Sequence, residues 1–299
     1  MLRLYSALLS LSLIWGLSFV FIKILLEAAG VWGTVFVRCI AGVVILLPIL
    51  WLKRKEIVRP LPWKSLVIIG VLNAGLPWGL ITLSETKITT SSASVLNATT
   101  PIWTGLLGYL LFSSKLSKGQ WIGILTGFVG ILVLMDFNIQ TLFGESFFGV
   151  GTMLVATACY GFSTQYAKKK LGNIGVVALT TISLLVGAAV GVIGMIFTHP
   201  IQIEKLIEPK VLLVIIGLGC FGSGIAQLLY YFMVREGSPE FASTVTYIIP
   251  LSAILWGYVF FKEPITTQLI IGLFIILFGV FLSTRKVKSK DKVLLSQKV

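Results

Sequence analysis

SSASVLNATTPIWTGLLGYLLFSS, at residues 91–114, is the stretch that decides the fold. Small residues lead into an apolar segment that contains Pro101, and a polar residue, Ser114, stands 13 residues beyond the proline. The same order returns 149 residues later, where Pro250 is followed after 13 residues by Glu263. We therefore predict that one structural unit is used twice along the chain.

Further matches between the two halves of the chain support this duplication. In chain order, they are an aromatic-Gly-x-Ser motif at 15–18 and 160–163, LVIIG at 66–70 and 213–217, and Gly123 with Gly272. One such match between apolar segments can arise by chance, but three in the same order are difficult to dismiss.

The composition is that of a membrane protein. Of the 299 residues, 57% are apolar and 12% are charged, and the mean hydropathy is +0.99. Soluble proteins carry about 25% charged residues, so this chain lacks the polar residues that would cover a soluble globule. A helix that crosses the bilayer needs roughly 20 apolar residues, and a membrane barrel would show alternation instead. Ten continuous apolar runs occur, at 4–26, 32–52, 64–84, 90–112, 119–136, 147–166, 175–198, 211–234, 239–261 and 267–284.

The predicted fold class is therefore an all-α polytopic membrane protein with ten transmembrane helices. Each copy of the unit has five spans, and because five is odd, the second copy enters the membrane from the opposite side. We expect two inverted five-helix repeats, at 5–136 and 148–284, followed by a basic tail at 285–299. Two related halves that face opposite ways are typical of carriers that work by alternating access.

The distribution of charge predicts the orientation. With a cytoplasmic N-terminus, the even-numbered loops and both tails carry eighteen Lys and Arg, whereas the odd-numbered loops carry four. This asymmetry favours cytoplasmic N- and C-termini in the cell membrane. The net charge of +13 is then a topology signal that implies no nucleic-acid partner. The first apolar run is longer than the 7–15 residues of a signal-peptide core, so we predict that it is retained as a span.

Polar and aromatic side chains near mid-span are the candidates for a substrate site, because lipid offers polar groups no partner. The predicted substrate-binding residues are Trp15, Asn73, Trp78, Asn97, Tyr160, Gln227, Tyr230, Thr246 and Tyr247. Amides, hydroxyls and aromatic faces suit a small zwitterion or a modestly polar organic molecule. The alternative is a structural role in hydrogen bonding between helices, worth about 0.6 kcal/mol on average, or in packing.

Two cations fall within the outer part of the first two spans. Lys23 and Arg38 are predicted to form a gate or to contact an anionic group, more so Arg38. The alternative is that both side chains extend to the interface, with Glu27 one turn from Lys23. The acids at span edges are Glu27, Glu85, Asp136 and Glu263. None lies deep in a span, which argues against a buried proton relay. Facilitated transport, exchange and coupling through an acid at the interface all stay open.

Prolines and glycines indicate where helices bend. Pro77, Pro101 and Pro250 are predicted kink positions, because proline removes a helix hydrogen bond. Glycines at 217–224 allow close approach or bending in the eighth span. The three cysteines show no CxxC spacing, so no disulfide framework, metal site or cofactor is predicted. No His/Asp/Glu grouping indicates a catalytic residue, so an enzyme is not expected.

Taken together, these residues resemble the drug/metabolite transporter superfamily with two EamA-type domains. The resemblance covers about 5–136 and 148–284 and rests on the aromatic-Gly-x-Ser motifs, Arg38, the two proline segments and the paired glycines. The family pattern usually has a glutamate after each proline segment. Glu263 matches it, and Ser114 departs from it.

The resemblance implies a secondary transporter that exports small metabolites, such as amino acids or related compounds. A multidrug exporter or a sugar-type importer of the same fold is the alternative, and a non-transporting receptor or assembly subunit is a distant one. The expected partners are a small-molecule substrate and the lipid bilayer, and the expected state is a monomer or a weak homodimer.

Overall fold

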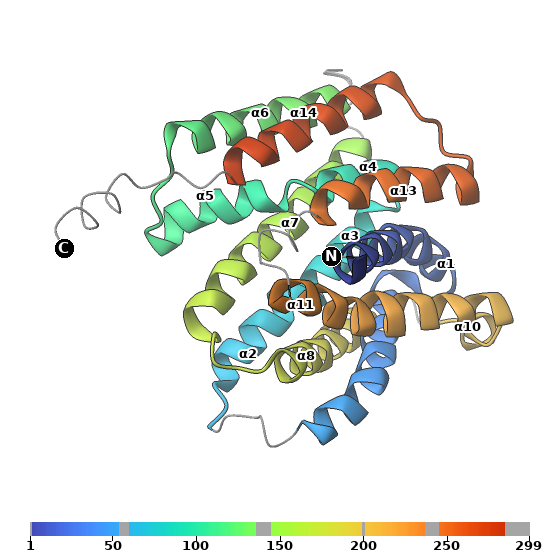
Figure 1. The fold of residues 1–299 in the computed structure, drawn as a ribbon. Helices are drawn as coiled ribbons and strands as arrows, with labels where there is room; N and C mark the ends of the chain where they lie inside the picture. The colour runs from blue at the N-terminus through green and yellow to red at the C-terminus, as the bar shows by residue number, and fades with distance from the viewer. Residues whose placement is uncertain (1, 54–59, 136–144, 199–200, 237–244, 285–299) are drawn as a thin grey trace, which may run out of the picture.

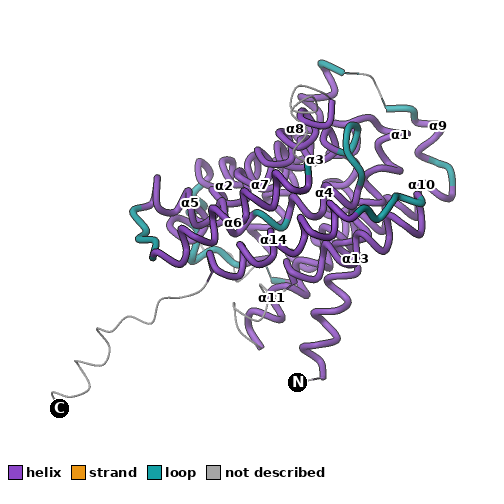
Figure 2. The backbone as a smooth tube through the Cα atoms, turned by 90° about the horizontal axis from the view of Figure 1, so that it is seen from above, coloured by secondary structure: helices purple, strands orange, loops and turns teal. Residues whose placement is uncertain are grey.

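The computed structural model describes residues 2–53, 60–135, 145–198, 201–236 and 245–284. In these ranges the regular elements are helices and no strand occurs (Figures 1 and 2). Seven helices are long and apolar enough to cross a membrane, and two shorter apolar helices accompany them. The predicted class, an all-α polytopic membrane protein, is confirmed.

The first element, α1 (Leu2–Leu52), combines the first two predicted spans. Gly30 interrupts its helical backbone with φ 68° and ψ −176°. Residues with a Cβ rarely adopt a positive φ, so a glycine is needed at this reversal. With α1 divided at Gly30, the described helices account for the ten predicted apolar runs in order.

The remaining spans follow the predicted runs to within a few residues, apart from the ends that lie outside the described ranges. In chain order the elements are α2 (Trp63–Gly70), η2 (Val71–Gly75), α3 (Leu76–Ser84), α4 (Thr90–Asn97), α5 (Thr100–Phe112), α6 (Lys118–Leu134), α7 (Glu145–Lys170), α8 (Val176–Ile196), α9 (Ile203–Leu206), α10 (Pro209–Ile215), η4 (Ile216–Ile225), α11 (Ala226–Glu236), α13 (Val245–Phe261) and α14 (Thr267–Thr284).

Two of the spans widen into π-helix at matching places. The first LVIIG motif leads directly into η2, and the second overlaps the start of η4. In both cases the chain continues as an α-helix without a loop, as α3 and as α11. The glycine-rich part of the eighth span is therefore irregular but unbroken. π-Helical segments are rare and occur frequently at functional sites.

The three predicted kink prolines stand in different settings. Pro101 follows a break, since α4 ends at Asn97 and α5 begins at Thr100. Pro77 lies in the first turn of α3, directly after η2. A missing amide N–H is tolerated in a first helical turn. Pro250 lies inside α13, which runs through it without interruption.

Helices α6 and α14 pack side by side, as Figure 1 shows at its top. A Cβ on Gly123 would lie 2.6 Å from the carbonyl oxygen of Gly279. The reciprocal contact uses the matching residues of the two halves, since a Cβ on Gly272 of α14 would lie 3.2 Å from the carbonyl oxygen of Gly130 of α6. Glycine at these positions lets the two backbones approach closely.

A second matched contact links the aromatic-Gly-x-Ser motifs to the proline segments. A Cβ on Gly16 would lie 2.9 Å from Ala253 N, and a Cβ on Gly161 would lie 2.8 Å from Thr104 N. The two glycines are 145 residues apart, and their partners are 149 apart. Both matched contacts are those that a pseudo-twofold axis between the halves would produce.

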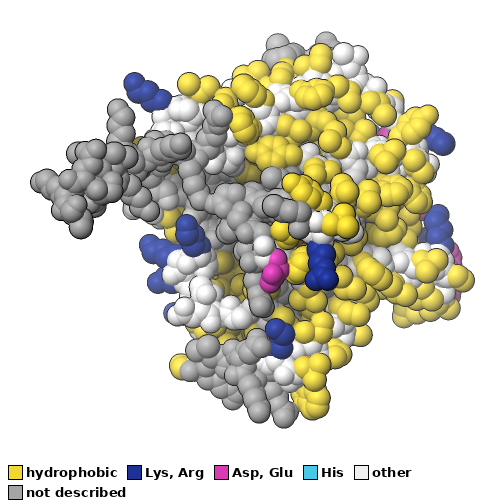
Figure 3. Space-filling view, viewed as in Figure 1, with side chains coloured by type: hydrophobic (Ala, Val, Ile, Leu, Met, Phe, Trp, Pro, Cys, Tyr) yellow, Lys and Arg dark blue, Asp and Glu magenta, His cyan; other side chains and the backbone are white. Residues whose placement is uncertain are grey.

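Several segments distant in sequence meet at one end of the bundle, which we call the Glu263 end. It contains residues 23–33, 85–91, 201–202 and 262–263. There, Gln202 N donates to Ala28 O at 3.2 Å, and Thr90 and Ser91 contact Glu263. Many large apolar side chains are exposed on the described helices, and they cover much of the face seen in Figure 3. Such a surface is expected where lipid surrounds the protein.

Candidate functional site

Arg38 lies in the second half of α1 and is buried, with 7% of its surface exposed. Its Cζ lies 3.6 Å from the centroid of the Trp78 ring, and its Nε donates a hydrogen bond to Ser223 Oγ at 2.8 Å. These three residues come from α1, α3 and η4. The structure thus brings together a predicted charge contact and a predicted substrate-binding aromatic residue.

The π-helical geometry of η4 positions the partners of this arginine. Ser223 Oγ donates to Leu218 O, five residues earlier, at 3.0 Å, which leaves its lone pairs for Arg38. The neighbouring carbonyl, Gly222 O, accepts a hydrogen bond from Trp15 Nε1 at 3.1 Å. Two consecutive residues of η4 therefore hold one cation and one indole.

Further predicted aromatic residues are connected to this group. The ring of Trp15 lies 5.9 Å from that of Tyr230, centroid to centroid. Tyr160, on α7, faces both the charge of Arg38 and the side chain of Trp78. Trp15, Tyr160 and Tyr230 are half-buried, so part of each ring remains available for contact.

The charge of Arg38 is not balanced by a carboxylate in contact with it. Within the described part of the chain, Arg38 forms no ion pair, and its protein hydrogen bond is the one from Nε. A buried charge without an ionic partner is costly. A buried guanidinium without an ionic partner is suited to binding an anionic group.

The remaining predicted substrate-binding residues lie on η2, α4, α11 and α13. Asn97, at the end of α4, has a buried Oδ1 without a hydrogen-bond partner in the described residues. Tyr247 Oη lies 3.3 Å from Thr284 Oγ1, in the contact between α13 and α14. Asn73 is half-buried in η2, as are Gln227 on α11 and Thr246 on α13.

Lys23 is held at the Glu263 end by a partner other than Glu27. Its Nζ lies 3.5 Å from Glu263 Oε1 and 5.1 Å from the centroid of the Phe261 ring. Glu27 is exposed. The ion pair joins α1 to the turn that follows α13, so this lysine connects two spans that are distant in sequence.

Glu263 caps the first turn of α4. Its carboxylate accepts hydrogen bonds from Thr90 N and Oγ1 at 2.8 and 2.7 Å, and from Ser91 N and Oγ at 3.0 and 2.6 Å. Burial opposes ionisation, but these bonds from Ser91 and Thr90 outweigh it and lower the pKa of Glu263. A carboxylate at a helix N-terminus is also favoured by the helix dipole.

The turn that presents Glu263 occurs in both halves of the chain. Lys262 has φ 54°, and Glu263 N donates to Gly257 O at 3.3 Å. At the corresponding positions Ser113 has φ 56°, and Ser114 N donates to the carbonyl oxygen of residue 108 at 3.0 Å. In both turns the backbone bond reaches back six residues across a residue in the left-handed conformation, which ends the helix. The duplicated turn carries an acid in one half and a hydroxyl in the other.

Glu85 lies at the edge of a span, as expected from the sequence, but its burial was not expected. It directly follows Ser84, and only 3% of its surface is exposed. Both carboxylate oxygens are buried and have no hydrogen-bond partner among the described residues. Burial raises the pKa of Glu85 well above its usual value, and Glu263 adds to the rise, while Lys23 and Arg38 oppose it. Glu263, which is 6% exposed, is likewise buried despite its edge position.

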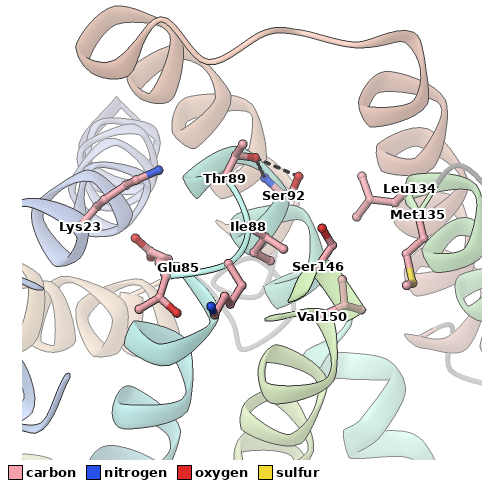
Figure 4. Close-up of a pocket in the computed structure, with 11 residues that line it drawn as sticks. Lys23, Glu85, Ile88, Thr89, Ser92, Leu134, Met135, Ser146 and Val150 are labelled. Carbon is pink, nitrogen blue, oxygen red and sulfur yellow. Dashed lines mark hydrogen bonds between the residues drawn. The ribbon is translucent and has the colours of Figure 1, made fainter. Parts of the chain in front are cut away.

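A cavity of about 510 Å³ adjoins these charged residues. Figure 4 shows Lys23 of α1 and Glu85 of the loop after α3 near one side, with Leu134 and Met135 on the other. The lining is completed by Thr86, Lys87, Ile88, Thr89, Ser92, Ser146 and Val150. It combines cations, one acid, hydroxyls and apolar side chains at the Glu263 end.

A comparison with protein families decides the identity of the chain. The EamA-like transporter family matches at residues 2–136 and 147–285. The chain belongs to this family. It is therefore a multi-pass membrane transporter, and transporters of this family are not enzymes in general.

Individual relatives extend over almost the whole EamA-family chain. The uncharacterized inner membrane transporter YedA of Escherichia coli is 28% identical over 95% of this chain and 91% of its own length. The uncharacterized transporter YoaV of Bacillus subtilis is 23% identical, with 95% and 97% covered. One solved crystal structure has a similar fold, with a TM-score of 0.59, 16% identity, and 92% of this chain and 96% of its own covered.

Proposed function

We propose that this EamA-family protein is a secondary transporter that exports a small metabolite bearing an anionic group, an amino acid or a related compound. The observation that carries the proposal is the environment of Arg38, which is buried on Trp78 and Ser223 without an acidic partner among the described residues. Guanidinium is planar and matches a carboxylate with two parallel hydrogen bonds.

The surrounding residues suit the rest of such a substrate. Tyr160 lies near the cation, Trp15 is bound to Gly222 next to Ser223, and Tyr230 contacts Trp15. Aromatic faces accept apolar or aromatic side chains with little demand for exact polar geometry. This combination favours carboxylated metabolites over neutral sugars.

Alternating access is supported by the correspondence of the two halves. Both units contain the same structural features. These are the close helix contacts at Gly16 and Gly161 and the π-helical segments η2 and η4. We propose inverted repeats at 5–136 and 148–284, whose exchange of conformation exposes Arg38 to each side in turn. We also place the protein in the cell membrane with both termini cytoplasmic.

The test is flux in proteoliposomes with pairs of compounds that differ only in the carboxylate, such as an amino acid and its decarboxylated amine. The wild type is expected to move the amino acid. Arg38→Gln should reduce this flux by tenfold or more, since one lost charged hydrogen-bonding interaction is worth roughly 1.5–3 kcal/mol. Arg38→Lys should also be impaired, because an ammonium lacks the bidentate fork.

The matched control is Arg3→Gln, which removes an arginine from an exposed position. Its flux should equal that of the wild type. Equal transport of both compounds by the wild type, or unchanged transport by Arg38→Gln, would show that the substrate's anionic group does not bind at Arg38.

A multidrug exporter is the second candidate, and the aromatic contact between Trp15 and Tyr230 favours it. In that case lipophilic amines would be moved, and Arg38 variants would move them no worse than the wild type. Binding without flux of any compound, by a folded protein, would instead indicate a receptor.

A further inference from the structure

The buried acid at the Glu263 end suggests a role beyond substrate binding. We propose that Glu85 is a proton-binding site, which holds a proton in the conformation described here and exchanges it with solution when the contact between Lys23 and Glu263 opens. The proposal rests on the proposed transport function for its coupling role, but not for the presence of the proton.

The first argument is the contrast between two glutamates of similar burial. Glu263 receives four hydrogen bonds and an ion pair. Glu85 receives none within the described residues, and both of its carboxylate oxygens are shielded from solvent. An ionised carboxylate without hydrogen bonds is strongly disfavoured in such surroundings, whereas the neutral acid is not. The geometry therefore favours a proton on Glu85 and none on Glu263.

The second argument is the set of charges that face Glu85. Lys23 and Arg38 approach from α1, Glu263 approaches from the turn after α13, and Lys87 stands two residues away in the same loop and lines the same cavity. From α4 the cavity receives Ser92, and from α7 it receives Ser146 and Val150, and none of these described side chains is charged. One of these cations, Lys23, forms its ion pair with Glu263 and not with Glu85.

The third argument is that the two acids compete for one lysine. While Glu85 carries its proton, it does not attract Lys23, which stays on Glu263 and links α1 to the capped start of α4. When the proton leaves Glu85 for water, a carboxylate remains beside Lys23 and draws the ammonium towards the end of α3. Loss of the proton thus weakens the contact that joins α1, α4 and α13, and proton occupancy is coupled to the conformation of this end.

The cavity provides the connection to solution. Glu85, Lys23 and Lys87 all contribute to its lining, although the oxygens of Glu85 are themselves covered. A carrier that exchanged protons freely in every conformation would leak them. A gated proton site must be closed to solution in one conformation and close to it in another. Glu85 meets both conditions, because its carboxylate oxygens are covered here and its side chain lines the cavity.

The proton itself is observable by infrared spectroscopy of the purified full-length protein, without any substrate. The wild type at neutral pH should show the carbonyl band of a protonated carboxylic acid, and this band should be absent from Glu85→Gln and retained in Glu27→Gln, an exposed acid at the same end. A spectrum unchanged by Glu85→Gln would overturn the proposal. If Glu85→Gln fails to fold, Lys23→Met serves instead: removal of the neighbouring cation should raise the pH at which the band disappears, and an unchanged pH would contradict the proposal.

Coupling is tested with proteoliposomes under an imposed pH gradient. For one proton per substrate, one pH unit changes the substrate accumulation ratio by up to about tenfold. The wild type and Glu27→Gln should respond to the gradient, and Glu85→Gln should not. An equal response of Glu85→Gln would overturn the coupling role. A carboxylic acid band in a protein that moves no compound would instead contradict the proposed transport function and leave the proton site in place.

Discussion

At the residue scale, Glu85 and Glu263 show how local partners determine the charge of two acids that lie at the same end of the molecule. Glu263 caps α4 and pairs with Lys23, and these contacts favour its ionised form. Glu85 has no hydrogen bond in the described residues, and burial favours its neutral form. The same side chain is therefore an ionised helix cap at Glu263 and a titratable group at Glu85.

We predict that Glu263→Gln destabilises the protein at neutral pH by on the order of 2 kcal/mol or more, because charged hydrogen bonds and the pairing with Lys23 are lost. Since the pKa of Glu263 is lowered on folding, its stabilisation is present above the unfolded value of about 4.3 and is lost as the pH falls through the lowered pKa. Thermal unfolding in detergent across pH measures this. The two proteins should differ most near neutral pH and converge in acid.

Glu27→Gln is the control for this measurement, because Glu27 is an exposed acid on α1 at the same end. It should follow the wild-type curve at every pH. If the difference in stability between Glu263→Gln and the wild type stays the same down to acid pH, the charge of Glu263 contributes nothing to stability. The effect of the substitution would then come from the neutral hydrogen bonds and packing alone.

The sequence predicts these residues only in part. The position of each acid at the edge of a span can be read from the apolar runs, and Arg38 and Trp78 are recognisable as unusual or aromatic groups in a span. The hydrogen-bond partners cannot be predicted from the sequence. Ser223, the partner of Arg38, is more than 170 residues away along the chain, and so are Thr90 and Ser91, the partners of Glu263. Small hydroxyl residues are common in membrane helices, so nothing local distinguishes them.

At the element scale, glycines determine which helices approach closely. We predict that Gly123→Ala destabilises the protein by about 1–3 kcal/mol, the usual effect of overpacking. The new Cβ would lie 2.4 Å from Ser283 N and 2.6 Å from Gly279 O, which are backbone atoms of α14 and cannot turn aside. Unfolding by denaturant or heat, measured in detergent, gives the difference.

Gly151→Ala is the matched control, because the same change on α7 meets nothing within 4 Å. Alanine is about 1 kcal/mol better than glycine in a helix, so this variant should be as stable as the wild type or more so. If Gly123→Ala behaves like Gly151→Ala, α6 and α14 do not pack as closely as described.

Element boundaries were predictable where composition alone determines them. The ten apolar runs coincide with the described helices because the length of a span is fixed by the bilayer, and Pro101 coincides with the break between α4 and α5. The π-helical segments were not predictable, since the residues of η2 and η4 suit an ordinary helix equally well. Their extra width follows from contacts with other spans, such as the approach of Gly219 to Arg38 O.

At the scale of the whole molecule, the two ends differ although the two halves correspond. Ser114 and Glu263 occupy equivalent turns, but only the second carries an ionisable group. A symmetrical carrier would favour neither end. In the alternating-access mechanism proposed above, the charged cap at the Glu263 end would favour the conformation in which α1, α4 and α13 are held together there.

The orientation of this asymmetric molecule determines which side receives the substrate and the proton, and we predict that the Glu263 end faces outward. Residues 262 and 115 are exposed and follow the ends of α13 and α5, which lie on opposite sides of the bundle (Figure 1). The excess of Lys and Arg lies with residue 115. Lys262→Cys should react in intact cells with a thiol reagent that does not cross membranes, whereas Lys115→Cys should react only after the membrane is opened.

The native cysteines are compatible with this assay, since Cys39 is buried and Cys159 and Cys220 are partly buried within spans. The unsubstituted protein gives their background. Labelling of Lys115→Cys but not Lys262→Cys in intact cells would show that the orientation is the opposite of the one predicted. Glu85 would then exchange its proton with the cytoplasm.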